Sequence, residues 1–380
     1  MNQIEILEKL YGQVLEFIRI KKLPKYNKLL TDNVDTLIEK IDKNKSLVSA
    51  LITSCVEKIA NPEQDIRYHR TDFENGYSAR VLDTKNTAPF CKKYFPKYAN
   101  KESAFLTLAT REKIAWTKET GDALKIRNKA VKTAFLEILD AIENRTVKPQ
   151  NVIVYTFTKL YELSLRQGVI FDDTIESSDF VNIININTIL EMLDKHFVTK
   201  LSSRLPVIAI YSVYEQLFKQ VNRYNGKVLR PLNVHTSSDK HGYGDVEIWN
   251  RDKTPFEMVE VKHNIPIDRN LIFDIVKKSA ETSIERYYIL TTAKDNFISA
   301  DEEEYINKFI LKIRNDTGLD VIANGIRYSL KYYLRFISDC KDFLKSYTKN
   351  LVEDAKISTE VQEFHITTWR NILQEHRLSD

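Results

Sequence analysis

Two short stretches in the second half of the chain alternate apolar and polar residues, and this pattern predicts a pair of β-strands. Residues 244–248 read GDVEI and residues 258–262 read MVEVK, each with the period of two that a strand imposes. The polar residues 250–255 between them have the composition of a tight turn, so we expect a hairpin. Such a hairpin brings alternate side chains of both strands onto one face.

The residues on either side of the hairpin predict further elements in a definite order. Apolar residues recur at helical spacing in 205–221 and again in 267–283. Residues 228–236 have a strand pattern, and residues 286–292 (RYYILTT) have the composition of a buried strand. The order from 205 to 292 is therefore helix, three strands, helix, strand, which predicts an α/β (α+β) core.

Outside this core the pattern predicts mainly helices. We expect a mainly helical, DNA-binding N-terminal region over 1–199, a core over 200–330, and a C-terminal helical extension over 331–380 that packs on the core or on a partner subunit. Residues 68–96 have little helical period, and Asn75-Gly76, Pro89 and Pro96 favour a loop or small hairpin there. The other predicted elements are helices over 1–60, 152–165, 188–197, 300–314, 328–347 and 359–376, and an edge strand over 319–323.

The polar side chains of the predicted hairpin have the chemistry of a metal-dependent hydrolytic site. Asp245 and Glu260 would face each other, with Lys262 on the same side and roughly 7 Å beyond Glu260. Magnesium prefers oxygen ligands and keeps several waters, so two carboxylates, the carbonyl of Val261 and substrate phosphate oxygens would suit it. Lys262 would orient or help to deprotonate an attacking water, or neutralise charge on the phosphate. An exposed hairpin with ordinary surface charges is the competing interpretation.

The same triplet of an acid, any residue and a lysine also occurs elsewhere in the chain. Asp83-Thr84-Lys85 follows Asp72, and these residues form an alternative metal site. No predicted helix and following strand completes a core around them. Asp354-Ala355-Lys356 lies in a polar stretch late in the chain. The sequence context therefore favours the triplet at Glu260.

These residues and the order of elements around them resemble the PD-(D/E)XK nuclease superfamily. Asp245, Glu260 and Lys262 match its three signature positions one by one, and Gly244 replaces the usual proline before the aspartate. Members often place another glutamate on the first core helix, a position that Glu215 matches. The resemblance covers residues 205–292. It implies a mixed central sheet flanked by helices, with Glu215 as an assisting catalytic carboxylate.

A narrower resemblance extends outside the core. The runs HTSSD (235–239), GDVEI and EVKH, together with RVLDTKNTAPFCKKYFP (80–96), resemble the SacI-type family of type II restriction endonucleases. This resemblance implies a magnesium-dependent homodimer that cleaves both DNA strands at a short symmetric site. It also implies a cognate DNA methyltransferase that is not a stable partner. Two alternatives remain: another nuclease of the superfamily (repair, structure-specific or modification-dependent), and a non-enzymatic DNA-binding protein.

Composition is compatible with a large cytoplasmic enzyme. At 380 residues and 43% hydrophobic content the chain can bury a sizeable core. No run approaches the ~20 apolar residues of a membrane span. Cys55, Cys91 and Cys340 are widely separated and odd in number, which favours a reducing compartment, packing roles and the absence of a zinc site. No glycine-rich phosphate loop is present, so a nucleotide cofactor is not expected.

The distribution of charge indicates where duplex DNA would bind. The net charge is +4, but residues 91–150 hold 13 Lys or Arg against 7 Asp or Glu, a local balance of +6. Lysines interleaved with aromatic residues suit contacts to DNA phosphates, although a solvated helix face is the competing interpretation. The candidate DNA contacts in this segment are Lys92, Lys93, Lys97 and Lys101.

Two further segments supply candidate DNA contacts. Arg80 and Lys85 lie in the loop-like region before the lysines, where arginine would read guanine in the major groove. His263 follows the lysine of the motif, although a packing or capping role is the preferred interpretation. The polar loop before Asp245 adds His235, Ser237, Ser238, Lys240 and His241, each of which also suits ordinary turn chemistry.

Overall fold

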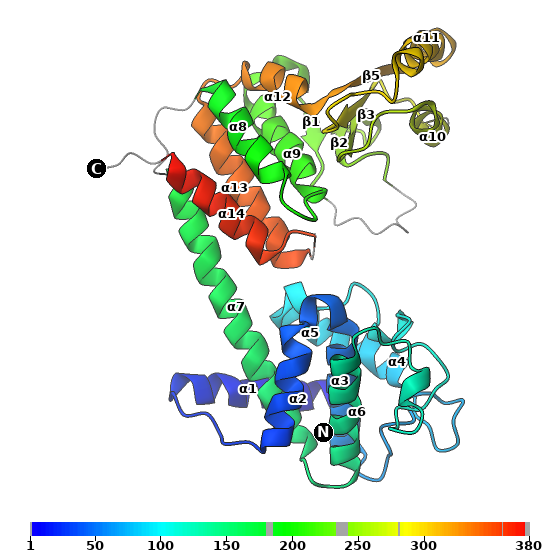
Figure 1. Ribbon diagram of the computed structural model, residues 1–380, viewed down its shortest axis with the longest axis vertical. Helices are drawn as coiled ribbons and strands as arrows, with labels where there is room; N and C mark the ends of the chain where they lie inside the picture. The colour runs from blue at the N-terminus through cyan, green and yellow to red at the C-terminus, as the bar shows by residue number, and fades with distance from the viewer. Residues whose placement is uncertain (1, 180–184, 233–241, 280–281, 359, 377–380) are drawn as a thin grey trace. The chain divides into compact units, whose positions relative to one another are not determined.

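A computed structural model describes residues 2–179, 185–232, 242–279, 282–358 and 360–376. It divides into two compact units, Met1–Gly168 and Val169–Asp380 (Figure 1). The boundary falls inside the long helix α7 (Pro149–Asp179), earlier than the boundary expected at residue 199. It falls there because helix α8 (Ile186–Phe197) buries Ile189 and Leu193 in the core of the second unit.

The first unit is built from helices, as the hydrophobic spacing predicts. Its core holds large aromatic side chains, among them Trp116, Phe135 and Phe157, which are almost fully buried. The longer helices besides the first part of α7 are α1 (Gln3–Arg19), α2 (Lys28–Glu39), α3 (Ile41–Ala60) and α6 (Lys129–Glu143). Short 3-10 turns occur at Pro96–Tyr98, Ala104–Leu106 and Gly121–Ala123.

The expected loop over 68–96 is correct only for its first half. Asn75 has a positive φ of 56°, and backbone bonds from the N–H of Tyr77 to the carbonyl of Tyr68 (3.1 Å) join the two arms of a tight loop. From Ala79 to Tyr94 the chain is helical instead. The bounds are α4 (Ala79–Leu82), a π-helical turn (Asp83–Thr87) and α5 (Ala88–Tyr94). Pro89 does not interrupt this stretch, and it lies at the start of α5, directly after the π-helical turn.

The second unit contains a mixed five-stranded sheet with the order β1-β2-β3-β4-β5. β1 with β2 and β2 with β3 pair antiparallel, whereas β3 with β4 and β4 with β5 pair parallel. The expected mixed α/β architecture and the edge position of the last strand are confirmed. The strands are β1 (Lys227–Leu229), β2 (Val246–Asn250), β3 (Pro255–Lys262), β4 (Arg286–Thr291) and β5 (Asp320–Gly325).

The predicted strand over 228–236 is realised only in part. β1 ends at Leu229, and residues 230–232 are not in a strand. Residues 233–236 lie outside the described part of the chain. Arg230 still donates its backbone N–H to the carbonyl of Glu247 at 3.0 Å, so the chain follows β2 for one more residue.

Helices cover both faces of the sheet (Figure 1). Val246 and Val259 point to one face and share a core with α9 (Arg204–Gln220). Met258 and Tyr287 point to the other face, where they pack with α10 (Arg269–Ser279) and α11 (Ala300–Thr317). Successive side chains of each hairpin strand therefore face α9 and the α10–α11 side of the sheet in turn.

The C-terminal helices pack on this core. The single helix expected over 328–347 is wrong, because the structure has two, α12 (Ile326–Leu334) and α13 (Cys340–Ile357). Asp339 separates them by capping α13: its side chain accepts a hydrogen bond from the N–H of Lys341 at 2.8 Å. The last helix, α14 (Glu363–Glu375), buries Trp369 in the same core as α9.

Two further observations complete the description. Within the described residues, no helix has the length and apolar character needed to cross a membrane. The three cysteines are free thiols, and Cys55 and Cys91 are buried in the first unit. Burial raises the pKa of the Cys91 thiol to about 12, which suits the packing role expected from the sequence.

Candidate active site

The predicted hairpin is present, and its geometry brings Asp245 to the second strand. β2 and β3 pair with Val246 opposite Val259, and the N–H of Asn250 donates to the carbonyl of Thr254 at 2.8 Å to close the turn. Asp245 lies directly before β2. Its Oδ2 accepts a hydrogen bond from the backbone N–H of Val261 at 2.8 Å. This bond fixes the Asp245 carboxylate between Glu260 and Lys262 along the chain of β3.

Gly244 permits this close approach. A Cβ atom at position 244 would lie 2.8 Å from the carbonyl oxygen of Val259, which is closer than real side chains come to a backbone oxygen. Glycine is therefore required by packing against β3, and a proline ring at this position would meet the same backbone. The departure from the motif of the resembled superfamily has a local physical reason.

Glu260 and Lys262 lie on the same face of β3 and form an ion pair. The Nζ of Lys262 is 2.6 Å from Oε1 of Glu260, and the two side chains are 28% and 12% exposed. Val246 pairs with Val259, so one step further along the hairpin Asp245 lies opposite Glu260. Because residues opposite each other share a face of the sheet, Asp245 lies on this face as well. The structure thus brings together the three residues that the sequence analysis singled out.

Two residues that the sequence analysis did not propose complete the surroundings of the site. Glu247 is 4% exposed, and it accepts hydrogen bonds from the N–H of Tyr243 at 2.7 Å and from Nε1 of Trp249 at 2.9 Å. Tyr287 is fully buried on β4 and donates its hydroxyl hydrogen to the carbonyl of Tyr243. The signal available was the period-two alternation of GDVEI for Glu247 and the strand composition of RYYILTT for Tyr287.

The pKa of Tyr287 shows how acidic this environment is. Burial raises that pKa well above its usual value of 10, and the negative charges of Glu260, Asp245 and Glu247 raise it further. The hydroxyl therefore stays neutral and acts as a hydrogen-bond donor beneath three carboxylates. Lys262 and Arg230 each pair with one of these carboxylates, at 2.6 Å and 3.9 Å, and carboxylate oxygens are the ligands that a divalent metal ion such as Mg²⁺ prefers.

The donor set fits magnesium bound by two carboxylates and substrate. Within the described residues, no three His, Cys, Asp or Glu side chains gather as a metal-binding group. Asp245 and Glu260 supply a pair instead, and Mg²⁺ commonly completes its shell with water and phosphate oxygens. The carbonyl of Val261 projects to the same side as its N–H, which contacts Asp245, because both groups of a strand residue point to one neighbouring strand. The Asp245 carboxylate and the carbonyl of Val261 therefore lie near each other, at the end of the hairpin away from its turn.

Glu215 is not brought to this site. Its carboxylate accepts hydrogen bonds from Asn350 (2.6 Å) and from the Ser346 hydroxyl, both on α13. The neighbouring Tyr214 bonds Glu257, which lies three residues, or roughly 10 Å, before Glu260 on β3. Glu215 consequently lies on the side of the sheet that α9 covers, with its carboxylate bonded to α13.

His263 is held within the protein. Its Nε2 lies 3.0 Å from the Ser202 hydroxyl, and its Nδ1 lies 2.9 Å from the Thr292 hydroxyl. Burial lowers its pKa, so the ring is neutral near pH 7. These contacts favour the packing role, and they anchor the end of β3 to the turn before α9.

The lysines expected to contact DNA differ in their surroundings. Lys92 is exposed and donates to the carbonyl of Lys101 at 2.7 Å, and Lys93 pairs with Glu8 at 3.1 Å. Lys97 is only 6% exposed, so it does not lie on the surface as expected. Arg80, Lys85 and Lys101 are exposed. The candidates His235, Ser237, Ser238, Lys240 and His241 lie outside the described residues.

The two competing acid-x-lysine triplets have structural roles. Asp83 is fully buried, and its two oxygens accept hydrogen bonds at 2.8 Å from Ser49, Ser103 and the N–H of Ala104. Asp354 pairs with Arg204 at 2.8 Å, and both side chains are 3% exposed. Neither carboxylate is presented to a substrate, which supports the preference for Glu260.

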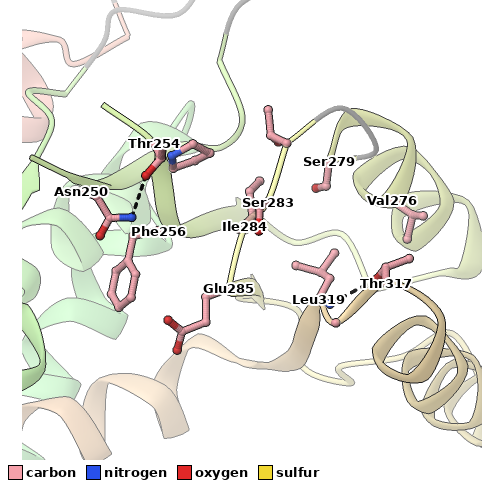
Figure 2. Close-up of a pocket in the computed structure, with 13 residues that line it drawn as sticks. Asn250, Thr254, Phe256, Val276, Ser279, Ser283, Ile284, Glu285, Thr317 and Leu319 are labelled. Carbon is pink, nitrogen blue, oxygen red and sulfur yellow. Dashed lines mark hydrogen bonds between the residues drawn. The ribbon is translucent and has the colours of Figure 1, made fainter. Parts of the chain in front are cut away.

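A cavity lies beside the sheet at the other end of the hairpin. Figure 2 shows this space of about 670 Å³ beside Asn250 and Thr254, which belong to the turn. Glu285 is its acidic member, and it pairs with Arg223 at 3.0 Å. The cavity shares no lining residue with the carboxylate site, so we assign it no part in the chemistry.

No protein-family model matches the chain, and no curated protein matches it.

Proposed function

We propose that this chain is a magnesium-dependent endonuclease that hydrolyses phosphodiester bonds of double-stranded DNA. The observation that carries the proposal is the placement of Asp245, Glu260 and Lys262 at the end of the β2–β3 hairpin away from its turn, held by the bond from the N–H of Val261 to Asp245. The order α9, β1 to β3, α10 and β4 agrees with the order expected from the PD-(D/E)XK resemblance. We therefore propose a core of that type.

Each residue of the site has a role in the proposed reaction. Asp245, Glu260 and the carbonyl of Val261 would hold the metal ion, which when bound supplies Lewis-acid stabilisation of the phosphate and activation of a water. Lys262 already lies 2.6 Å from Glu260, so its ammonium is positioned to hold the attacking water or to neutralise the developing charge. Glu215 has no part in this version of the site.

The finer proposal is a type II restriction endonuclease, which rests on the narrower resemblance. It predicts a homodimer, discrete fragments from a DNA of known sequence, and protection by a cognate methyltransferase. A repair or structure-specific nuclease would instead give fragments that depend on DNA damage or shape. A non-enzymatic DNA-binding protein is the second candidate, and the Glu260 to Lys262 ion pair favours it, because the pair neutralises a carboxylate without a metal.

Digestion of plasmid DNA with Mg²⁺ by the intact chain and by Asp245→Asn tests the proposal. Asparagine can still accept the hydrogen bond from Val261, so the fold and DNA binding should remain. Loss of a metal-binding charge should lower cleavage at least about 10³-fold, roughly 4 kcal/mol of transition-state stabilisation. Lys262→Gln should also be inactive.

Asp252→Asn provides the matched control, because Asp252 is an exposed aspartate in the turn of the same hairpin. It should cleave at the rate of the unchanged chain. Full cleavage by Asp245→Asn would refute the assignment. DNA binding without any cleavage, and without magnesium dependence, would favour the non-enzymatic alternative.

A further inference from the structure

The first unit contains a cavity whose walls carry an unusual number of arginines. It has a volume of about 360 Å³, within the size range of small-ligand sites. Residues from 69–80 and from 105–111 line it, and they include Arg70, Arg80 and Arg111. Asp72 is the acid among the lining residues. The cavity is therefore a concave site with a net positive charge.

Two of these arginines are available to a ligand. Arg70 is held by Asp72 at 2.6 Å and donates to the backbone carbonyl of Arg111, also at 2.6 Å. Arg80 and Arg111 are exposed, and among the described residues no ion pair or side-chain hydrogen bond involves either guanidinium. Planar guanidinium groups bind phosphate through two parallel hydrogen bonds, so this pair suits a phosphate group.

A buried histidine forms part of the wall. His69 is 1% exposed and stacks on Trp116, with ring centroids 3.8 Å apart and planes 9° apart. Neither of its ring nitrogens has a hydrogen-bond partner of good geometry in the described structure. Burial lowers the pKa of His69 to about 4, although the nearby backbone of Arg67, Thr110 and Glu112 opposes this effect.

A neutral imidazole at this position has one donor and one acceptor to offer. Buried polar groups without partners are uncommon in folded proteins and call for an explanation. A simple contact between surface arginines and a phosphate would need neither the cavity nor this histidine. A ligand that carries both a phosphate and a hydrogen-bonding ring would use all of these features. Phe105, which is 5% exposed, adds an aromatic wall.

We infer that this cavity binds one nucleotide of DNA, with the phosphate on Arg80 and Arg111 and the base edge at His69. The identity of the ligand as DNA rests on the proposed function. The position of the cavity, in the unit that lacks the carboxylate site, makes it a recognition site and not a catalytic one. Proteins that take a nucleotide out of the stack read its base in such a pocket by hydrogen bonding and aromatic contact.

Calorimetric titration of the full chain with 2′-deoxynucleoside 5′-monophosphates tests the pocket without requiring cleavage. At least one of the four should bind about tenfold or more tightly than its nucleoside or than inorganic phosphate. The double variant Arg80→Ala with Arg111→Ala should lose this binding. Arg127→Ala, an exposed arginine of the same unit outside the cavity, should keep it.

His69→Phe separates recognition from structure. Phenylalanine keeps an aromatic ring on Trp116 and removes both nitrogens, so the unit should fold at least as well as before. The nucleotide should then bind no more tightly than inorganic phosphate. Equal nucleotide binding by this variant and the unchanged chain would overturn the assignment, as would the absence of nucleotide binding by the unchanged chain.

The source of the nucleotide is tested by competition. A saturating monophosphate should weaken duplex DNA binding by Asp245→Asn, and His69→Phe should raise the KM for DNA cleavage while leaving kcat unchanged. Nucleotide binding that leaves DNA affinity unchanged would overturn the assignment to DNA. If the unchanged chain binds nucleotide but does not cleave DNA, the nuclease proposal is refuted and the nucleotide pocket is not. If the pocket variants cleave DNA normally, the proposed role of the pocket is refuted and the nuclease proposal is not.

Discussion

At the scale of single residues, the candidate site depends on atoms that touch no substrate. Gly244 lets the chain before Asp245 lie against Val259, and Tyr287 holds the carbonyl of Tyr243. Both residues fix the position of the Asp245 carboxylate. Small displacements of such a group have large kinetic effects, because a misplacement of about 1 Å can cost about a hundredfold in rate.

Gly244→Ala should therefore reduce both DNA cleavage and stability. The added Cβ would lie 2.8 Å from the carbonyl oxygen of Val259, so the backbone must shift by a few tenths of an ångström. We expect cleavage to fall by about tenfold or more, with a loss of about 1–3 kcal/mol in the free energy of unfolding. Cleavage rates and urea unfolding measure the two effects.

The matched control for this substitution is Gly12→Ala. No atom lies within 4 Å of a Cβ at position 12, and the residue is inside α1. Alanine there should raise stability by up to ~1 kcal/mol through helix propensity and leave cleavage unchanged. Unchanged cleavage by Gly244→Ala would show that the approach to β3 is not needed for the chemistry.

Tyr287→Phe tests the hydroxyl beneath the carboxylates. The substitution leaves the buried carbonyl of Tyr243 without its donor, which should cost about 1–3 kcal/mol of stability. Tyr243 is the residue before Gly244, so cleavage should fall as well, through kcat. Tyr288→Phe on the same strand is the control, because Tyr288 faces the opposite side of the sheet from Tyr287. An effect of equal size on kcat in both variants would contradict a positioning role for Tyr287.

At the scale of elements, the sequence predicted most of the second unit, and the reasons for its errors are local. Alternation predicted β2 and β3, and the composition of a buried strand predicted β4, whose two faces are both covered by apolar side chains of the helices. The break between α12 and α13 was missed because a capping residue, Asp339, interrupts an otherwise continuous apolar spacing. The helix over Ala79–Tyr94 was missed because its apolar faces are irregular across a π-helical turn.

For the candidate site, too, the sequence predicted some features and missed others. Alternation was sufficient to bring Asp245, Glu260 and Lys262 together, since strand register determines which side chains share a face. It could not assign Glu215, because helical periodicity does not specify which neighbouring element a partly exposed side chain meets. In the structure that neighbour is α13, whose Asn350 bonds the Glu215 carboxylate.

The hairpin turn offers an element-scale prediction. Lys253 adopts a positive φ of 67°, which disfavours a residue with a Cβ, and Lys253→Gly removes that cost. Since glycine also loses more entropy on folding, we expect a net gain of up to about 1 kcal/mol, with cleavage unchanged at the far end of the hairpin. Lys294→Gly, an exposed lysine with negative φ, should lower stability instead. Equal losses in both variants would contradict the strain in the turn.

At the scale of the whole molecule, the two units have separate cores, and each buries a histidine. His196 on α8 lies 2.9 Å from the Tyr347 hydroxyl through Nδ1 and 2.9 Å from the carbonyl of His365 through Nε2. A carbonyl can only accept, so Nε2 carries the hydrogen and Nδ1 accepts from Tyr347. Burial lowers the pKa of His196 to about 3, so the folded unit keeps the ring neutral.

This arrangement makes the second unit sensitive to acid. The unfolded histidine has a pKa of about 6.5, so between pH ~6.5 and about 3 the unfolded chain binds a proton that the folded chain does not. Stability is therefore fully present above pH ~6.5 and is lost as the pH falls, by up to ~1.4 kcal/mol per pH unit. From pH 7 to pH 5 the loss from His196 should be about 2 kcal/mol.

Substitution of one histidine at a time should reveal whether the units unfold independently. His196→Gln should reduce the acid-induced loss in the urea transition reported by Trp369, which is buried beside His196. His69 lies in the first unit, where it stacks on Trp116, and its pKa is lowered like that of His196. His69→Phe should therefore reduce the acid-induced loss of stability only in the transition reported by Trp116. Two transitions, each responding to its own histidine, are expected from two compact units with separate cores. A single transition that responds equally to both substitutions would mean that the units unfold as one cooperative body.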